Sequence, residues 1–223
     1  MKEKIALVLT DTGDIKEAKI ILKKCGWCEL RIDEFLKKYP EEKLKECISL
    51  KTQAKKIGTI RWYKEHQGKG LQIPERKRLE IYKKILEYVD YVDVEIRSKI
   101  AKDVIKSARE SGKKVIVSYH NFSKTPSIKT LEKVYRSGRR LKPDIIKVAT
   151  KVNSPDELFT LLYFTYNFSK RHKLVITPMG VSFIERLIPL YFGSLFTYIS
   201  FNTKTAPGQI SYKEVCRYLL NTD

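Results

Sequence analysis

Eight short stretches of the chain are rich in apolar and β-branched residues, and longer amphipathic stretches separate them. They cover residues 5–10, 28–33, 56–61, 91–97, 114–120, 144–150, 174–180 and 196–202. Several are almost continuously apolar, which is typical of parallel strands that are covered on both faces. The pattern therefore predicts eight parallel strands.

Helical periodicity lies between these strands. The clearest predicted helices cover residues 75–87, 99–110, 127–141 and 154–171. The last of them begins with Ser154 and Pro155, a capping residue followed by proline at the first helical position. Strand–helix alternation of this length predicts a parallel sheet, either open and doubly wound or closed as a (β/α)8 TIM barrel. Eight units in 223 residues fit the barrel, and because no linker divides the chain we expect one α/β domain over residues 1–223.

The composition excludes several classes of protein. No apolar run approaches the roughly 18 residues that a membrane span needs, and the apolar run after Lys4 is too short for a secretory signal. Four cysteines in a chain of 223 residues do not make a disulfide scaffold. We therefore expect a cytoplasmic protein that has no membrane partner.

The net charge of +19 allows more than one kind of partner. Such a charge is found in proteins that bind nucleic acid, an anionic membrane face or an acidic small substrate. Here the basic residues are spread along the chain and mixed with glutamate, as in residues 41–46, which is typical of solvated helix faces. We therefore expect no nucleic acid as the main partner. The alternative, a basic nucleic-acid-binding protein, predicts binding that weakens steeply with salt.

Chemically active side chains recur near the carboxyl ends of the predicted strands. They are Glu29, Arg31, Arg61, Glu95, Arg97, His120 and Lys147, followed by Met179, Gly180 and residues 205–209 after the last two strands. In a (β/α)8 barrel these positions meet at one rim, where enzymes of this fold place their chemistry. The sequence therefore predicts an active site at that rim.

Lys147 is the sharpest single candidate, because Ile146 and Val148 flank it in an apolar strand. Burial disfavours an ammonium group, so the pKa of this lysine should be depressed and its amine should be a usable nucleophile. The alternative is a lysine whose charge is paired inside the barrel, or one that lies on an edge strand.

His120 ends an apolar strand and opens a polar loop, where a histidine can exchange protons near neutral pH. The alternative is a structural histidine that is bonded to the next loop. Glu95, on the adjacent strand, could hydrogen-bond the imidazole and fix its tautomer, or it could pair with a barrel cation such as Lys147. His66 and His172 lie in a Gly/Lys loop and a basic run, so we do not assign them to the site.

Cys25 and Cys28 have the CxxC spacing of thiol oxidoreductases. In those proteins the pair opens a helix, whereas here it follows a helical stretch and enters a strand. A zinc site would need a second ligand pair, which Cys47 and Cys216 do not supply. We therefore expect packing cysteines and no metal, and the lack of a phosphate-cradling glycine motif predicts no nucleotide cofactor.

Seven short motifs follow one another at these strand ends. They are Glu29-Leu-Arg31-Ile-Asp33, Thr59-Ile-Arg61, Val92-Asp-Val-Glu95, Ser118-Tyr-His120-Asn-Phe122 with Thr125-Pro126, Asp144-Ile-Ile-Lys147, Met179-Gly180 and Ala206-Pro207-Gly208-Gln209. In this order they resemble the type I 3-dehydroquinate dehydratases, the Schiff-base-forming enzymes of the shikimate pathway. The resemblance covers essentially the whole chain. It implies a (β/α)8 barrel that needs no metal or organic cofactor and is often a homodimer.

The resemblance also implies a role for each motif residue. Lys147 would form an imine with the substrate ketone, His120 would act as general base and then general acid, and Glu95 would orient His120. The substrate-binding residues would be Glu29, Arg31, Arg61, Arg186, Thr205 and Gln209. The implied reaction is the dehydration of a small anion, 3-dehydroquinate, to 3-dehydroshikimate on the route to chorismate and the aromatic amino acids.

The chain departs from the family's pattern in two places. After Gly180 it is about one residue shorter than usual and has Glu185 where serine is common, so the choice of Arg186 as the carboxylate-binding residue depends on that gap. Thr205 replaces a serine and keeps the hydroxyl group. A second lysine-imine enzyme, aldolase-like, stays open as an alternative and would carry a glycine-rich phosphate loop after the last two strands. The Pro207-Gly208 pair predicts a loop that is mobile without substrate.

Overall fold

The computed structural model describes residues 2–11, 13–66, 68 and 70–219, without the side chains of residues 216–219. The strands are β1 (Ile5–Leu9), β2 (Trp27–Arg31), β3 (Lys55–Thr59), β4 (Tyr91–Glu95), β5 (Lys114–Asn121), β6 (Ile145–Lys151), β7 (Leu174–Met179), β8 (Thr197–Ser200) and β9 (Ile210–Ser211). The α-helices are α1 (Ile15–Leu22), α2 (Ile32–Lys38), α3 (Leu44–Ile48), α4 (Glu75–Ile85), α5 (Ala101–Glu110), α6 (Ile128–Arg140), α7 (Pro155–Ser169), α8 (Phe183–Leu187) and α9 (Tyr212–Leu219). The 3-10 turns are η1 (Lys2–Lys4), η2 (Glu41–Lys43), η3 (Tyr63–Glu65), η4 (Leu86–Tyr88) and η5 (Ile188–Leu190).

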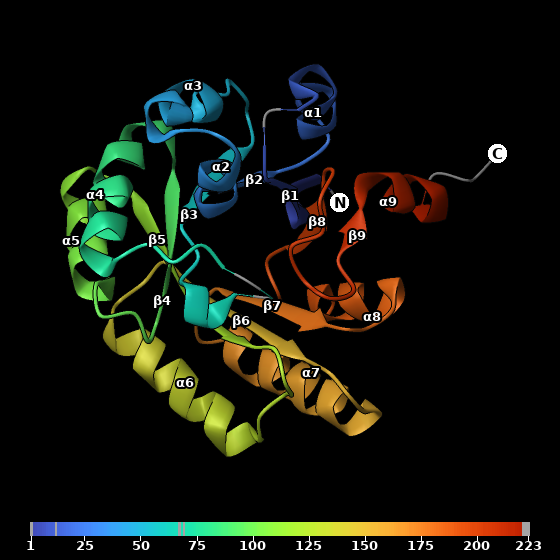
Figure 1. The fold of residues 1–223 in the computed structure, drawn as a ribbon. Helices are drawn as coiled ribbons and strands as arrows, with labels where there is room; N and C mark the ends of the chain where they lie inside the picture. The colour runs from blue at the N-terminus through green and yellow to red at the C-terminus, as the bar shows by residue number, and fades with distance from the viewer. Residues whose placement is uncertain (1, 12, 67, 69, 220–223) are drawn as a thin grey trace.

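All nine strands belong to one parallel sheet in the order β7-β6-β5-β4-β3-β2-β1-β8-β9. The sheet curls, and the helices lie along its outside (Figure 1). Each of the eight predicted strands coincides with an observed strand, with ends that agree within two residues, so the strand prediction is confirmed. Within the described residues, no helix combines the length and the hydrophobicity that a membrane span requires.

The curled sheet closes through a short seam between β7 and the segment before β8. One isolated bridge joins Leu174 to Ser194. The backbone N–H of Leu195 donates to the Leu174 carbonyl at 2.8 Å, and that of Ile176 donates to Ser194 Oγ at 3.0 Å. The two-residue strand β9, which the sequence analysis missed, pairs with β8. The fold is therefore a (β/α)8-type barrel in which β7 and β8 meet by this seam rather than by a full ladder.

Side chains alternate along each strand between the barrel interior and the helical layer. The interior is filled at its base by Ala6, Val8, Trp27, Ile57, Tyr91, Ile116, Ile145, Val175, Phe196 and Tyr198. Toward the carboxyl ends the same inward positions become polar, so that Tyr91 is followed on β4 by Asp93 and Glu95, which are both fully buried. Because inward-facing residues recur every second position, the barrel interior is apolar near the amino ends of the strands and polar near their carboxyl ends.

Candidate active site

A cavity of about 470 Å³, counted to its open mouth, lies at the carboxyl ends of the strands. Eight of the nine predicted site residues line it: Glu29, Arg31, Arg61, His120, Lys147, Arg186, Thr205 and Gln209. The ninth, Glu95, is fully buried and is not part of the cavity wall. Residues up to 180 positions apart in the sequence therefore converge on one site, at the rim that the strand ends predicted.

Lys147 projects from β6 into this cavity and is 5% exposed. Its Nζ lies 3.0 Å from Asp93 Oδ2 and 3.3 Å from Glu29 Oε1, and the ring centre of Tyr198 is 4.1 Å away. The amine of Lys147 is therefore surrounded by two carboxylates and one aromatic face. The sequence led us to expect only apolar surroundings, and the structure shows instead the charge-paired lysine that was the alternative, placed where a ligand can reach it.

Asp93, which the sequence analysis did not single out, holds the centre of this charge network. Its Oδ1 accepts a hydrogen bond from Ser118 Oγ at 2.6 Å, and Arg61 Nη2 lies 3.3 Å from Oδ2. Burial alone would raise the pKa of Asp93, but Arg61 and Lys147 beside it hold that pKa well below its usual range. The available signal was its position two residues before Glu95, which places both carboxylates on the inward face of β4.

His120 lies on β5 next to the strand that carries Lys147. The ladder pairs Ser118 with Lys147 and His120 with Ala149, so the imidazole and the amine face the same end of the barrel. Burial, together with the charges of Arg61 and Lys147, lowers the pKa of His120 well below its ordinary value. The imidazole is therefore neutral and able to accept a proton.

Glu65 is the carboxylate that holds His120. Its Oε2 accepts the backbone N–H of His120 at 2.9 Å and lies 3.1 Å from Nδ1. Arg61 Nη1 is farther from that nitrogen, at 3.4 Å, while Arg97 Nε donates to the other oxygen of Glu65 at 2.8 Å. Burial and the nearby Glu95 carboxylate raise the pKa of Glu65 to about 7. An ionised Glu65 thus fixes the imidazole with its proton on Nδ1.

The prediction that Glu95 orients His120 is wrong. Glu95 instead accepts hydrogen bonds from Arg61 Nη1 at 3.0 Å, Arg78 Nη2 at 2.7 Å and the backbone N–H of Trp62 at 2.8 Å. Its cationic partners are thus arginines, and Lys147 is not one of them. Glu95 therefore holds the guanidinium group of Arg61 in place. Glu65 was missed because it lies on η3, in an irregular connection where no strand or helix period indicates which way a side chain points.

Two of the predicted substrate-binding arginines are already paired with acids. Arg31 donates to Asp33 through Nε at 3.0 Å and through Nη2 at 2.7 Å. Arg61 is held between Asp93 and Glu95. Burial by itself would lower the pKa of Arg61, but these carboxylates raise it well above its ordinary value. Both guanidinium groups line the cavity with their charge largely neutralised.

Arg186 differs from them in having no acidic partner among the residues that the structure describes. Among the described residues, no carboxylate oxygen lies within 4.0 Å of its nitrogens, although it is 1% exposed. Its Nη1 donates to the carbonyls of Pro178 at 3.1 Å and Pro207 at 3.3 Å, and its Nε is buried without a hydrogen-bond partner. Burial lowers the pKa of Arg186 to about 10. A buried cation in this state favours an anionic ligand.

The unusual Glu185 next to it has a structural role. Ser182 Oγ accepts the backbone N–H of Glu185 at 3.4 Å, while Glu185 Oε2 accepts the backbone N–H of Ser182 at 2.9 Å. This reciprocal pair is a capping box that starts α8. It sets the helix so that the next residue, Arg186, points back into the barrel.

The loop after β8 lies against the loop after β7. Gln209 Oε1 accepts from the backbone N–H of Thr205 at 2.6 Å and from its Oγ1 at 3.0 Å. The backbone N–H of Gly180 donates to the Pro207 carbonyl at 3.1 Å. Gly208 has a φ of 66°, and a Cβ there would lie 2.8 Å from the Val181 carbonyl oxygen. Gly208 therefore allows this close contact between the loops, and the mobility of the loop stays a prediction.

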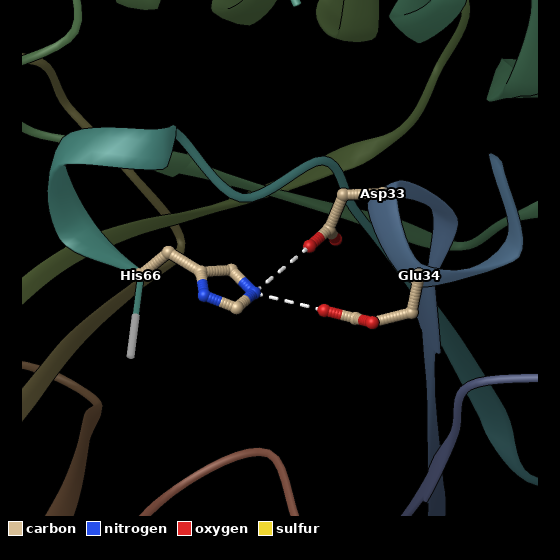
Figure 2. A group of neighbouring side chains, drawn as sticks. All are labelled: Asp33, Glu34 and His66. Atoms are coloured by element: carbon tan, nitrogen blue, oxygen red, sulfur yellow. Dashed lines mark hydrogen bonds and ion pairs between the residues drawn. The ribbon is translucent and has the colours of Figure 1, made fainter. Parts of the chain in front are cut away.

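Asp33, Glu34 and His66 form the one three-residue group of possible metal ligands within the described chain (Figure 2). His66 Nε2 lies 2.8 Å from Glu34 Oε1 and 3.7 Å from Asp33 Oδ2. Arg31 Nη2 approaches these same two oxygens, at 3.6 and 2.7 Å. A divalent cation placed there would meet the guanidinium charge, so the group is better described as a charge network. His66, which the sequence analysis left out, lies in the cavity wall.

The CxxC pair has the packing role that the sequence predicted. Cys25 and Cys28 are free and buried, and so is Cys47. Burial raises the pKa of Cys25 to about 11, which removes the thiolate that redox chemistry needs. The side chain of Cys216 lies outside the described residues.

Comparison with known proteins agrees with this geometry. The family model of the type I 3-dehydroquinases matches residues 5–222. The chain belongs to the type I 3-dehydroquinase family. A relative named 3-dehydroquinate dehydratase, from Thermodesulfovibrio yellowstonii, is 36% identical over 215 residues, which cover 95% of this chain and 92% of that protein.

Solved structures named 3-dehydroquinate dehydratase share the fold of this type I 3-dehydroquinase. The one from Geobacillus kaustophilus has a TM-score of 0.86 at 26% identity, and the match covers 99% of this chain and 91% of that chain. The one from Clostridium difficile, described with covalent modified comenic acid, has a TM-score of 0.79 at 28% identity and coverages of 98% and 91%. The resemblance inferred from the seven motifs is thereby confirmed.

Proposed function

We infer that this chain is a hydro-lyase that removes water from 3-dehydroquinate to give 3-dehydroshikimate through an imine on Lys147. Membership of the type I 3-dehydroquinase family over nearly its whole length supports this activity. One observation carries the mechanism: a buried lysine and a neutral histidine lie on adjacent strands and face the same cavity.

Lys147 makes the difficult proton removal possible. Its amine adds to the substrate ketone and water leaves, which produces a protonated imine, a much better electron sink than the carbonyl. The positive charge that the imine nitrogen then carries lies beside Asp93 and Glu29, whose carboxylates stabilise it. The solved relative described with a covalent modified ligand supports a covalent step in this family.

His120 transfers the protons. Glu65 engages Nδ1, so Nε2 is the nitrogen that takes the proton from the carbon next to the imine. The electrons form an enamine, and the tertiary hydroxyl leaves as water with a proton from the imidazolium. Hydrolysis of the imine then frees the product and restores the amine. In this scheme Glu65 positions the base, which is the role first given to Glu95.

Arg186 binds the substrate carboxylate. It is the buried arginine at the cavity that lacks an acid partner among the described residues, and its planar fork suits a carboxylate. Gln209 lines the same cavity, and its side-chain oxygen is already held by Thr205, which leaves its amide N–H groups as the donors that a ligand oxygen can use. Glu29, Arg31 and Arg61 complete the wall that faces the substrate's hydroxyl groups.

Borohydride trapping tests this function. The protein is incubated with 3-dehydroquinate and sodium borohydride, and the adduct is located by peptide mass spectrometry. We expect a stable adduct on Lys147, and no adduct or turnover in Lys147→Ala. Lys151→Ala, which removes a lysine from the end of the same strand but outside the cavity wall, is the matched control and should retain both. Full activity in Lys147→Ala would overturn the imine mechanism.

We also propose that two copies associate through α7. Its residues 155–169 include no lysine or arginine, although the chain carries 45. Phe159, Tyr163 and Tyr166 repeat at helical spacing on this helix and are 72%, 54% and 50% exposed. Two chains of charge +19 repel each other, so a helix whose own residues carry no positive charge is the segment most compatible with a homodimer, with Lys170 over the ring of Tyr166 at its end.

Light scattering after gel filtration tests this interface. The wild type is expected to be a dimer and Phe159→Glu/Tyr163→Glu a monomer. Ile20→Glu, at a 60% exposed apolar residue on α1, is the matched control and should remain dimeric. A dimer that persists in the double variant would move the interface away from α7.

We propose, finally, that residues 1–223 act as one domain in the cytoplasm. The sheet continues without a break from β7 to β9, and Cys25, Cys28 and Cys47 are free thiols, which a reducing compartment preserves. One cooperative unfolding transition that reductant does not shift is the expected result.

A further inference from the structure

Tyr198 touches the reacting nitrogen, yet the mechanism above gives it no role. It projects from β8 into the barrel, is 3% exposed and forms part of the cavity wall. The centre of its ring lies 4.1 Å from Lys147 Nζ. This contact places the phenol beside the atom that bonds to the substrate carbon.

The hydroxyl group of Tyr198 is buried and has no hydrogen-bond partner within the described protein. A buried hydroxyl without a partner destabilises the folded state, and a phenylalanine would fill the same space without that cost. Thr177 Oγ1, in the wall of the same cavity, is also buried without a partner. Two such hydroxyls at one cavity indicate a ligand that carries several polar groups, as a polyhydroxylated ring does.

We propose that Tyr198 is a further catalytic residue, whose hydroxyl donates a hydrogen bond to the carbinolamine oxygen formed when Lys147 adds to the substrate ketone. This proposal rests on the imine mechanism above. As the nitrogen–carbon bond forms, the electron pair of the carbonyl moves to its oxygen. That oxygen takes a first proton from the attacking nitrogen and a second from the imidazolium of His120. The carbon–oxygen bond then breaks, water leaves, and the nitrogen lone pair completes the protonated imine.

The geometry makes this oxygen the natural partner of the phenol. It is attached to the carbon that bonds to Nζ, and Nζ lies over the ring of Tyr198. A donor beside this oxygen stabilises the negative charge that develops on it during addition and assists its departure as water. Tyr198 keeps its own proton throughout, while the proton transfers remain with His120.

The surroundings keep the phenol in its protonated form. Burial, together with the negative charges of Glu29 and Asp93, raises the pKa of Tyr198 well above its ordinary value. The hydroxyl is therefore protonated at neutral pH and can act as a donor. The carboxylates that stabilise the iminium cation thus also maintain the donor beside the leaving oxygen.

Tyr198→Phe tests the proposal, with Tyr91→Phe as the matched control. Tyr91 belongs to the same interior cluster but lies outside the cavity wall. The measurement is the rate at which the borohydride-trapped adduct forms in a single turnover, together with the melting temperature. We expect Tyr198→Phe to form the adduct about tenfold more slowly, which is the effect of one lost hydrogen bond. Its melting temperature should be unchanged or raised, and Tyr91→Phe should form the adduct at the wild-type rate.

Two results would overturn the proposal. One is a rate for Tyr198→Phe within twofold of the wild type. The other is an equal slowing in both variants together with lower melting temperatures, because this would assign the effect to packing. If the wild type itself forms no adduct on Lys147, the imine mechanism fails, so the two failures are distinguishable.

Discussion

Replacing Glu65 by glutamine should make the enzyme slower and change how its stability depends on pH. The variant keeps the size of the side chain but removes the charge from the oxygen that lies 3.1 Å from His120 Nδ1. A hydrogen bond to a charged group contributes about 1.5–3 kcal/mol, so its loss from the positioned base should reduce kcat about 10- to 100-fold. Substrate affinity should change little, since Arg186 is untouched.

The structure also gives the size of the stability effect. Burial raises the pKa of Glu65 from 4.5 to about 7, and each pKa unit corresponds to about 1.4 kcal/mol. Below pH 4.5 the carboxyl is protonated in both the folded and the unfolded state, and there is no cost. As the pH rises the unfolded state ionises first, so the folded state loses stability until the folded carboxyl has ionised too. Above pH 7 the accumulated loss is about 3 kcal/mol, which glutamine does not incur.

Two measurements check this reasoning. Denaturant unfolding at pH 5 and pH 8 should show the wild type losing about 2.5 kcal/mol of stability more than Glu65→Gln between these values, because part of the loss is already present at pH 5. In the wild type, kcat/KM should rise around pH 7 as Glu65 ionises, because the ionised carboxylate keeps the imidazole proton on Nδ1 and the lone pair on Nε2. This rise should be absent from the variant. Glu132→Gln, at a partly exposed residue of α6 outside the cavity wall, is the control. Identical pH dependence of unfolding in wild type and Glu65→Gln, or an unchanged kcat, would refute the assignment.

Three further predictions follow from single contacts. Arg186→Ala should raise KM for 3-dehydroquinate about 10- to 100-fold, because a charge-assisted pair with the substrate carboxylate is lost. An unchanged KM in steady-state assays would count against this role of Arg186. Gly208→Ala should lower kcat/KM and the melting temperature together. A Cβ at a φ of 66° costs about 1–2 kcal/mol, and it would also meet the Val181 carbonyl. Wild-type values of both quantities would contradict the loop contact. Asp93→Asn should destabilise the protein by about 3 kcal/mol, because Lys147 and Arg61 lose a buried counter-charge. The wild type should begin to lose this stabilisation as the pH falls through the ordinary pKa of aspartate. Urea unfolding from pH 7 to pH 3 should detect this onset in the wild type but not in the variant.

Much of the site could be predicted from the chain because parallel strands in a barrel share one direction. Once the apolar stretches are recognised as strands, their last residues must meet at one rim. Lys147 and His120 are therefore brought together by topology, and no knowledge of side-chain packing is needed. The two-residue period would also have indicated Asp93, had it been followed back along β4 from Glu95.

The carboxylate that holds His120 could not be predicted in this way. Glu65 lies on η3, in a connection whose path depends on what it packs against. Glu95 stands at a strand end and looked equivalent in the sequence, but Arg61 and Arg78 occupy its oxygens. Which of the two buried glutamates contacts His120 depends on which arginines pair with each carboxylate. These arginines come from other parts of the chain.

The alternation of strands and helices, the rim where polar side chains gather, and the presence of Lys147 and His120 at that rim could all be inferred from the sequence. The charged neighbours of these two side chains, in contrast, are fixed by the fold. Glu29, 118 residues away from Lys147 in the sequence, lies 3.3 Å from its amine because the sheet curls. The alternation of apolar and polar residues along a strand indicates which face of the sheet a side chain lies on, because that face depends on backbone geometry alone. Charge pairing depends on distances across the barrel interior, and these exist only after the strands have closed around it.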